Sequence, residues 1–277
     1  MYLAVPSKTP PSRITVLVYG ESRTGKTRLT GTFPRVFAIS DGVEGGFETY
    51  GYMPNEEFYE PDHPPVVASP QGEKKPGCFS IADVNASLAY LEDEVKNHPG
   101  RFQTVVIDSL TFLSDLYEDH FSRVFREEIE KNRWFLYQKL KTTLRSLMIT
   151  VHKLPLNVVW TALASSDEGS TAGPLIGGQT QKKLPAACNL LLYMNMFQRG
   201  SDDPVRELRT KKYGKYAVGH RYGDLLPDPV EPSYRALMDS IMESKAARAN
   251  GNGSAQPAVI PAAMRQVRQP VRRVVRR

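Results

Sequence analysis

Short apolar runs rich in β-branched residues alternate along this chain with segments of helical periodicity. The first run, ITVLVY at 14–19, ends at a glycine, and similar runs occupy 36–39, 102–107, 156–163 and 190–196. Runs of this length bounded by turn residues predict buried strands. Between them, apolar residues recur at the spacing of one helix face, for example at Ile81, Val84, Leu88 and Leu91.

Helices are predicted at 25–32, 81–96, 110–124, 134–147, 182–187 and 233–242. Segments 205–210 and 215–218 predict a late β-hairpin, and the Pro-rich stretch 51–79 predicts a surface insertion. Strands that alternate with helices favour a parallel sheet covered on both faces. We therefore predict an α/β fold with a mostly parallel central sheet flanked by helices, plus a C-terminal β-hairpin.

Composition narrows the class of protein. A chain of 277 residues with 40% hydrophobic and 24% charged residues is long enough for one sizeable domain. It has no apolar run of the length that spans a bilayer, and its N-terminus lacks the pattern of a secretory signal. The two cysteines, Cys78 and Cys188, are far apart. We therefore expect a protein of the reducing cytoplasm, with no membrane partner.

The net charge of +6 is concentrated at the C-terminus. Residues 264–277 hold six arginines and no acidic residue, so without them 30 basic residues balance 30 acidic ones. Residues 245–263 are rich in Ala, Gly and Pro and predict a flexible linker. We expect a globular domain at 1–244, the linker at 245–263 and a disordered Arg-rich tail at 264–277. Such a tail suits docking on nucleic acid, although a solvated tail that aids solubility is the alternative.

The strongest motif is GESRTGKT at 20–27, which directly follows the first predicted strand. Its glycines allow the backbone N–H groups to curl around phosphate oxygens, and the helix that follows adds its positive end. In such a loop the lysine reaches the β- and γ-phosphates and the threonine hydroxyl binds Mg²⁺. The predicted nucleotide-binding residues are Gly20, Glu21, Ser22, Arg23, Thr24, Gly25, Lys26, Thr27 and Arg28.

A second carboxylate motif completes the metal site. Asp108 ends the apolar strand 102–107, where a carboxylate can hold the Mg²⁺ shell. Ser109 follows it instead of the glutamate that serves many ATPases as base. The base is therefore expected in the loop SDGVEGG at 40–46, with Glu44 the first choice and Asp41 the second. The alternative is that these are turn acids between glycines.

These motifs together resemble a known family. The segments concerned are Tyr19–Thr27, Thr32–Pro34, Glu44–Gly46, Val105–Thr111, Val158–Ala162 and Gly219–Gly223. Over about residues 12–226 the chain resembles the RecA-like P-loop ATPases of the phage AAA-type nucleotide-binding family, which includes single-strand-annealing and recombination ATPases. The resemblance implies a RecA-like core, Mg²⁺-dependent ATP hydrolysis, a role on single-stranded DNA in recombination or replication, and a homo-oligomer, either ring or filament. If phage-encoded, the protein would act in the cytoplasm of the bacterial host.

The resemblance also assigns two further catalytic residues. Thr161, late in the fourth predicted strand, takes the place of a polar sensor of the γ-phosphate, although a β-branched strand residue is the alternative. Arg221 belongs with Lys211, Lys212 and Lys215 to a basic cluster. The cluster fits a finger toward a neighbouring subunit's γ-phosphate, a contact to DNA phosphates, or a solvated basic face.

Three functions remain open from the residues. The first is an ATPase that acts on DNA, with Lys26, Glu44, Asp108, Thr161 and Arg221 as its catalytic residues. The second is a nucleotide-dependent scaffold or loader with negligible hydrolysis, because Asp108 lacks a following glutamate. The third is a small-molecule kinase, which is disfavoured because the insertion 51–79 contains no arginine for a lid over the phosphates.

Overall fold

The computed structural model describes residues 12–42, 45–69, 76–165, 171–177, 180–197, 204–222 and 226–249. Its centre is an eight-stranded sheet. The strands are β1 (Thr15–Gly20), β2 (Val36–Ser40), β3 (Val66–Val67), β4 (Thr104–Asp108), β5 (Asn157–Leu163), β6 (Leu190–Phe197), β7 (Val205–Arg209) and β8 (Gly219–His220).

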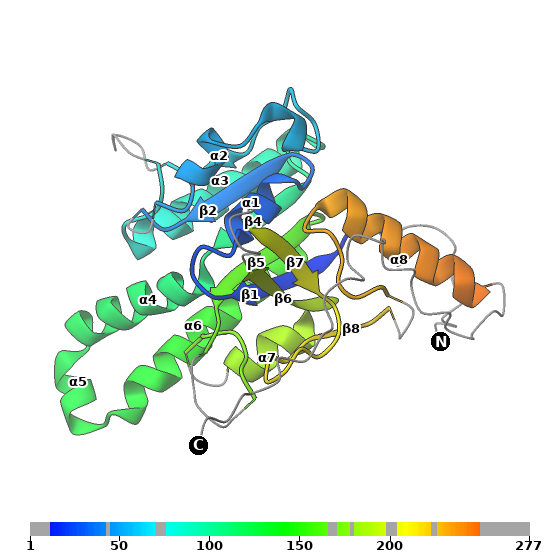
Figure 1. Ribbon diagram of the computed structural model, residues 1–277. Helices are drawn as coiled ribbons and strands as arrows, with labels where there is room; N and C mark the ends of the chain where they lie inside the picture. Colours follow the sequence, from blue (N-terminus) through cyan, green and yellow to red (C-terminus); the bar gives the residue numbers. More distant parts are fainter. Residues whose placement is uncertain are drawn as a thin grey trace, which may run out of the picture.

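The strand order across the sheet is β3-β2-β4-β5-β1-β6-β7, and β8 also pairs with β6 (Figure 1). All pairs from β3 through β6 are parallel, whereas β7 and β8 run antiparallel to β6. The strand β1 is therefore central, and its carboxyl end meets the ends of β5 and β4 at one edge. In open α/β sheets that edge is where ligands bind.

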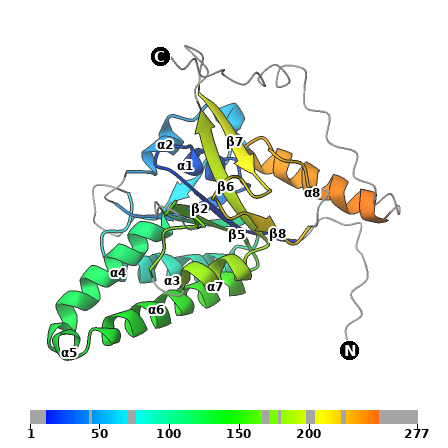
Figure 2. The same ribbon diagram turned by 60° about the horizontal axis from the view of Figure 1, so that its bottom comes forward.

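Helices cover both faces of the sheet. They are α1 (Lys26–Gly31), α2 (Glu48–Gly51), α3 (Ile81–Asn97), α4 (Leu110–Val124), α5 (Arg126–Lys131), α6 (Trp134–Lys153), α7 (Thr180–Ala187) and α8 (Tyr234–Ala249), with a short 3-10 helix at Asn55–Glu57. Figure 2 shows α3, α4, α6 and α7 on one side of the sheet and α1, α2 and α8 on the other. The helices α4, α5 and α6 form an arm with α5 at its far end.

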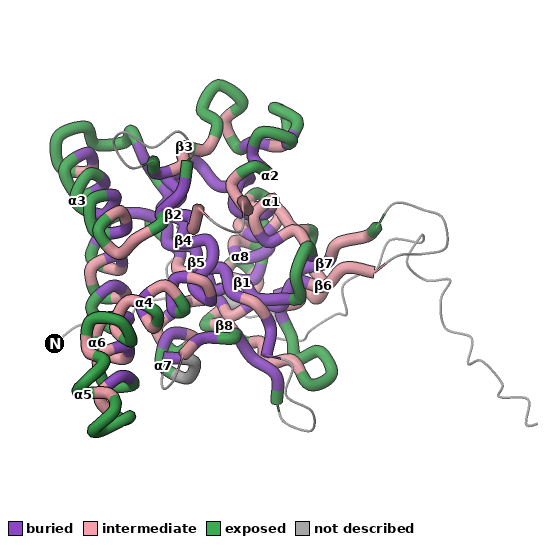
Figure 3. The backbone as a smooth tube through the Cα atoms, turned by 90° about the vertical axis from the view of Figure 1, so that its left-hand side faces the viewer, coloured by how far each residue is buried: buried purple, intermediate pink, exposed green. Residues whose placement is uncertain are grey.

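The alternation of side chains along buried strands creates two hydrophobic cores. On β1, Leu17 and Tyr19 face the core under α3, α4 and α6, whereas Val16 and Val18 face the core under α1 and α8. Successive side chains of a strand point to opposite faces, so strands buried on both sides read as continuous apolar runs. Figure 3 shows this buried centre, with exposed residues along the outer faces of the helices and in the loops around it.

The predicted fold class is confirmed, since the sheet is mostly parallel and helices flank both faces. The five predicted strands occur within two residues of their expected bounds. The charged segment between the two long helices is itself α5, and α6 runs six residues beyond the predicted end at 147. The insertion contributes β3, a two-residue strand at the edge of the sheet.

The predicted hairpin of 205–210 with 215–218 is wrong. The strand β7 pairs with β6 through Met196 opposite Arg206, so the antiparallel pair joins β6 and β7 instead. A single bridge between Leu208 and Val230 covers the outer side of β7. The apolar patterns of β6 and β7 were recognisable in the sequence, but the pattern of one strand does not specify the strand with which it pairs.

The helix α8 continues to Ala249, five residues past the boundary expected at 244. Helical structure therefore occupies the first residues of the segment predicted as a linker. Residues 250–263 and the predicted Arg-rich tail at 264–277 lie outside the described residues. Within the described chain, none of the helices combines the length and the apolar character that a bilayer crossing requires.

Truncation of a core residue of α6 tests the packing of this layer. Leu144 is buried against the sheet, whereas Ile149 on the same helix is 42% exposed. We expect Leu144→Ala to lower the free energy of unfolding by about 2–5 kcal/mol, because it leaves a cavity. Ile149→Ala should change it by less than about 0.5 kcal/mol. Urea denaturation measures both, and equal losses for the two variants would contradict this packing.

Candidate functional site

The loop Gly20–Thr27, here called the P-loop, joins β1 to α1 at the carboxyl edge of the sheet. Gly25 precedes α1 with φ 100°, a left-handed conformation that side chains rarely adopt. A Cβ atom on Gly20 would lie 2.4 Å from the carbonyl oxygen of Met194 on β6. Both glycines are therefore required by the backbone, one by its torsion angle and one by a close approach.

Two side chains hold the P-loop in its curled form. The Lys26 ammonium donates to the carbonyl oxygens of Gly20 at 3.1 Å and Glu21 at 2.7 Å. The Thr24 hydroxyl also donates to the Glu21 carbonyl, at 3.0 Å. Lys26 is only 8% exposed, so its charge lies in a largely desolvated place inside the loop. Because the effective dielectric constant is low in such a place, this ammonium would attract an anion in the loop more strongly than it would in water.

The predicted magnesium residues meet beside the P-loop. Asp108 ends β4, which lies next to β5, and β5 lies next to β1. The Thr27 hydroxyl donates to Asp108 Oδ2 at 2.7 Å, and the Thr161 hydroxyl on β5 donates to Oδ1. One carboxylate thus joins α1, β4 and β5. The peptide bond between Asp108 and Ser109 is cis, and the Ser109 side chain accepts from the backbone of α4 as its N-cap.

Burial dominates the electrostatics of Asp108. The residue is 6% exposed, and loss of water raises the pKa of its carboxyl above the ordinary value. The hydroxyl groups of Thr161 and Thr27 and the charge of Lys26 act in the opposite direction, whereas the charge of Asp41 adds to the rise. Burial also raises the pKa of Tyr50, and the nearby Asp108 adds to that shift. Burial therefore outweighs the three groups that stabilise the charged form of this carboxyl.

A cavity of about 480 Å³ opens between the P-loop and this carboxylate. Its walls are Ser22, Arg23, Gly25, Lys26, Thr27, Arg28, Gly45, Gly46, Thr49, Asp108, Ser109, Leu163 and Arg206. A Cβ atom on Gly46 would lie 3.3 Å from Asp108 Oδ2, so the glycine backbone closes one side. We call this space the phosphate cavity.

The hydroxyl and carboxylate oxygens of Thr27 and Asp108 are hard ligands of the kind that Mg²⁺ prefers. Among the described residues, no group of three or more His, Cys, Asp or Glu side chains is placed to hold a metal ion. Magnesium commonly takes one or two protein oxygens and completes its shell with water and the phosphates of a substrate. The two residues present fit that mode of binding.

A second cavity of about 550 Å³ lies on the outer side of the P-loop. It shares Gly25, Arg28 and Arg206 with the phosphate cavity, so the two spaces adjoin. Its other walls come from α1 and the residue after it, from the insertion, and from the segment before α8 with the first turn of that helix: Leu29, Thr32, Glu56, Glu57, Phe58, Tyr59, Glu231, Pro232, Ser233 and Arg235. We call this space the outer cavity.

The two candidate bases have different positions. Asp41 directly follows β2, and its backbone N–H donates to the Asp108 carbonyl at 3.2 Å. It lines a small separate cavity behind Asp108 rather than the phosphate cavity. Glu44 lies outside the described residues, but Gly45 and Gly46, which follow it, line the phosphate cavity.

Arg221 is not brought to the P-loop. It follows β8, which pairs with the start of β6, so it lies at the opposite edge of the sheet. Its guanidinium donates to the Ala186 carbonyl at the end of α7. Within one chain the structure therefore separates Arg221 from Lys26, Asp108 and Thr161.

Arg206 also belongs to this site, although its sequence pattern did not predict it. A Cβ atom on Gly25 would lie 2.7 Å from its Cδ atom, so the arginine packs directly on the P-loop. The only signal in the sequence was a basic residue in a predicted strand. The expected hairpin paired that strand with residues 215–218, so nothing placed Arg206 beside the P-loop.

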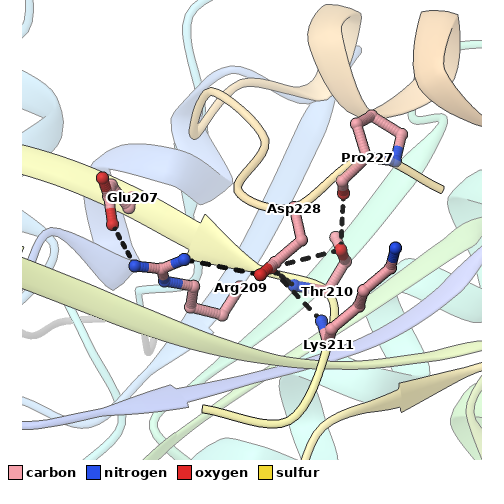
Figure 4. A network of polar contacts seen from close by, with 6 residues as sticks. All are labelled: Glu207, Arg209, Thr210, Lys211, Pro227 and Asp228. Carbon is pink, nitrogen blue, oxygen red and sulfur yellow. Dashed lines mark hydrogen bonds and ion pairs between the residues drawn. The ribbon is translucent and has the colours of Figure 1, made fainter. Parts of the chain in front are cut away.

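A polar network fixes the end of β7 (Figure 4). Arg209 pairs with Glu207 at 2.8 Å and with Asp228 at 3.4 Å. Asp228 also accepts from the backbone N–H groups of Thr210 at 2.8 Å and Lys211 at 3.3 Å. The strand and the turn that follows it are thus anchored to the segment before α8.

Loss of the hydroxyl of Thr161 tests the network around Asp108. Thr161→Val keeps the shape of the side chain but removes a donor from a buried carboxylate, so we expect a loss of about 1–3 kcal/mol in the free energy of unfolding. Thr161→Ser, which keeps the donor, should lose less. Urea denaturation at neutral pH measures both. A valine variant as stable as the wild type would show that this hydrogen bond has no net effect.

Comparison with known proteins agrees with this geometry. A family model described as an AAA domain matches residues 12–252. No curated protein gives a significant match to the chain. The matched range runs from just before β1 to just past α8 and so includes every element around the phosphate cavity. Because it covers most of the sequence, the chain belongs to the AAA domain family of nucleotide-binding ATPases.

Proposed function

We propose that the protein binds and hydrolyses ATP with Mg²⁺ and acts on single-stranded DNA in phage-type recombination or replication, in the cytoplasm of a bacterial host. The observation that carries the ATPase part is the joining of Thr27, Asp108 and Thr161 at the P-loop. A curled loop with a buried lysine provides a phosphate site, and the adjacent carboxylate provides a metal site.

The residues in and beside the phosphate cavity have separate roles in this proposal. Lys26 supplies a positive charge to the β- and γ-phosphates. Thr27 and Asp108 would hold Mg²⁺, which neutralises charge on the phosphates during transfer. Thr161 fixes the orientation of Asp108 through its hydrogen bond, which is a positioning role. This role differs from a direct sensor of the γ-phosphate, because its hydroxyl is fully buried.

We assign the general base to Glu44, since the glycines that follow it line the phosphate cavity. Asp41 is the alternative, but it faces a separate small cavity behind Asp108. A base must lie within hydrogen-bonding reach of the attacking water, in the space where the γ-phosphate is held.

The outer cavity fits the nucleoside half of the nucleotide. It adjoins the phosphate cavity at Gly25, Arg28 and Arg206 and has a volume typical of small-molecule sites. The ring of Tyr59 and the apolar side chain of Leu29 offer surfaces for a base, and the charged groups of its rim offer partners for ribose and base edges.

The DNA part of the proposal is supported by a basic turn beside the P-loop. Residues 211–215, KKYGK, are all exposed and carry three lysines. The turn is tied to the sheet by stacked rings, with Tyr216 on Tyr193 at 3.8 Å between centroids. The Tyr216 hydroxyl also lies 3.3 Å from the Glu21 carboxylate of the P-loop. Phosphates bound at the turn would therefore act next to the nucleotide site, and the Arg-rich tail would add to the affinity.

The oligomer is part of the same proposal. Because Arg221 lies at the sheet edge opposite the P-loop, it can reach a γ-phosphate only in a neighbouring copy. A ring or filament in which one copy's P-loop edge meets the next copy's opposite edge satisfies that condition.

A nucleotide-dependent scaffold or loader with negligible hydrolysis is the second candidate. It is favoured by Ser109, because many ATPases carry a glutamate at the position that follows Asp108 here. In this case the same site would bind ATP and switch the conformation of the protein without rapid turnover.

Three substitutions separate these functions. We expect Lys26→Ala to abolish ATP binding, because the variant lacks the positive charge that attracts the phosphates. Glu44→Gln should retain binding but lower single-turnover hydrolysis by about 10²–10⁴-fold, the usual contribution of a general base. Asp41→Asn serves as the matched control and should retain most of the rate. Fluorescent ATP binding and phosphate release measure the two properties.

The opposite outcomes are equally specific. If Asp41→Asn loses the rate and Glu44→Gln does not, the assignment of the base is wrong. If the wild type binds ATP but does not hydrolyse it with or without single-stranded DNA, the scaffold replaces the ATPase.

Removal of the basic turn tests the DNA site. We expect replacement of Lys211, Lys212 and Lys215 by alanine to abolish stimulation of hydrolysis by single-stranded DNA. The salt slope of DNA binding should fall by about two, since three phosphate contacts are lost. The matched control replaces three exposed lysines of the helical face, Lys96, Lys131 and Lys153, by alanine. Equal effects of the two triple variants would indicate only a general effect of net charge.

A further inference from the structure

The side chain of Arg206 reaches the P-loop from the neighbouring part of the sheet. The strand β7 pairs with β6 beyond the end of β1, and Arg206 stands opposite Met196. A Cβ atom on Gly25 would lie 2.7 Å from Cδ and 2.8 Å from Nε of Arg206. The arginine therefore occupies the space that a side chain at Gly25 would need, and it lines both the phosphate cavity and the outer cavity.

The charge of Arg206 is not neutralised within the described part of the chain. Arg206 makes no hydrogen bond or ion pair there, and its Nε is buried without an acceptor. The neighbouring arginines differ, because Arg28 pairs with Glu57 and Arg209 pairs with Glu207 and Asp228. A buried N–H without an acceptor is unfavourable unless a ligand completes it.

The strand that carries Arg206 is anchored in the absence of a ligand. The polar network of Arg209, Asp228 and Thr210 anchors the end of β7, and the bridge between Leu208 and Val230 covers its outer side. The anchored strand and the packing of the side chain on Gly25 reduce the entropy that Arg206 loses on binding, so the residue is partly preorganised.

We propose that Arg206 binds the α- and β-phosphates of the nucleotide held by its own chain. The proposal rests on the proposed function of the P-loop. Arg206 lies where the two cavities join, and the Thr27–Asp108 pair marks the other end of the phosphate cavity. The junction between phosphates and nucleoside is the place of the α-phosphate and the adjoining β-phosphate. The planar guanidinium matches two phosphate oxygens at once, which an ammonium does not.

This role differs from that assigned to Arg221. A finger from another copy acts on the γ-phosphate and accelerates hydrolysis, whereas Arg206 contacts phosphates that ADP retains. Arg206 therefore contributes to ATP and ADP binding alike. Its loss should raise KM and leave kcat nearly unchanged, since equal binding of ground state and transition state does not alter kcat.

Calorimetric titration of the full chain with ATP, ADP and adenosine tests this inference. We expect Arg206→Gln to weaken ATP and ADP by about 10–100-fold, the range of a hydrogen bond to a charged group, and to leave adenosine unchanged. Arg206→Lys should recover only part of the affinity. Arg145→Gln, an exposed arginine of α6 on the other sheet face, is the matched control and should bind all three as the wild type does.

The outcomes separate this inference from the function on which it rests. If the wild type binds ADP and Lys26→Ala does not, the P-loop functions as proposed; an Arg206→Gln variant of wild-type ADP affinity would then overturn the role of Arg206 alone. An equal loss for ADP and adenosine would also overturn it, since it would indicate a structural change. Thermal unfolding of each variant checks folding, and the lysine variant repeats the test if the glutamine variant is unstable. A wild type that binds no nucleotide would overturn both proposals.

Discussion

The buried carboxylate of Asp108 is the constraint on which the site depends. It is shared by hydroxyl groups from α1 and β5, so it joins the P-loop helix to two strands that are far apart in sequence. A carboxylate in so dry a place is stable only with several donors or a cation beside it. Burial raises the pKa of Asp108 because it disfavours the charged carboxylate, and a metal ion beside that carboxylate would offset this cost. The buried carboxylate of Asp108 therefore both joins the elements at this edge of the sheet and provides the site for a metal ion.

The parallel sheet gives that carboxylate its neighbours. With β1 at the centre, the carboxyl ends of β4, β5 and β1 meet at one edge, and no loop has to reach far to assemble the site. The antiparallel strand β7 adds a contribution that a purely parallel sheet lacks, because it returns toward the P-loop and carries Arg206 there. The site is thus formed by parallel strands on one side and by an antiparallel strand on the other.

Much of this arrangement could be predicted from sequence, for identifiable reasons. The P-loop is recognisable because the backbone requires glycine at Gly20 and Gly25, and because phosphate and metal binding require Lys26 and Thr27. Asp108 is recognisable because it ends a buried strand. The pairing of β7 was mispredicted, since strand pattern alone does not specify the partner, and Arg206 was missed as a consequence. Arg221 was grouped with the other catalytic residues by resemblance, but the register of β8 places it at the other edge. Site residues that belong to a local sequence motif could be predicted, whereas contacts that depend on strand pairing could not.

The two outer strands of the sheet also have a consequence for the behaviour of the protein in a crowded solution. An open sheet edge offers unpaired backbone groups that can recruit strands from other molecules. Here β3 contributes only two residues to its edge, and the bridge to Val230 covers the outer side of β7 at Leu208. Both edges are therefore poor templates for strand addition. The sheet can keep its long, hydrophobic parallel centre without promoting aggregation through its borders.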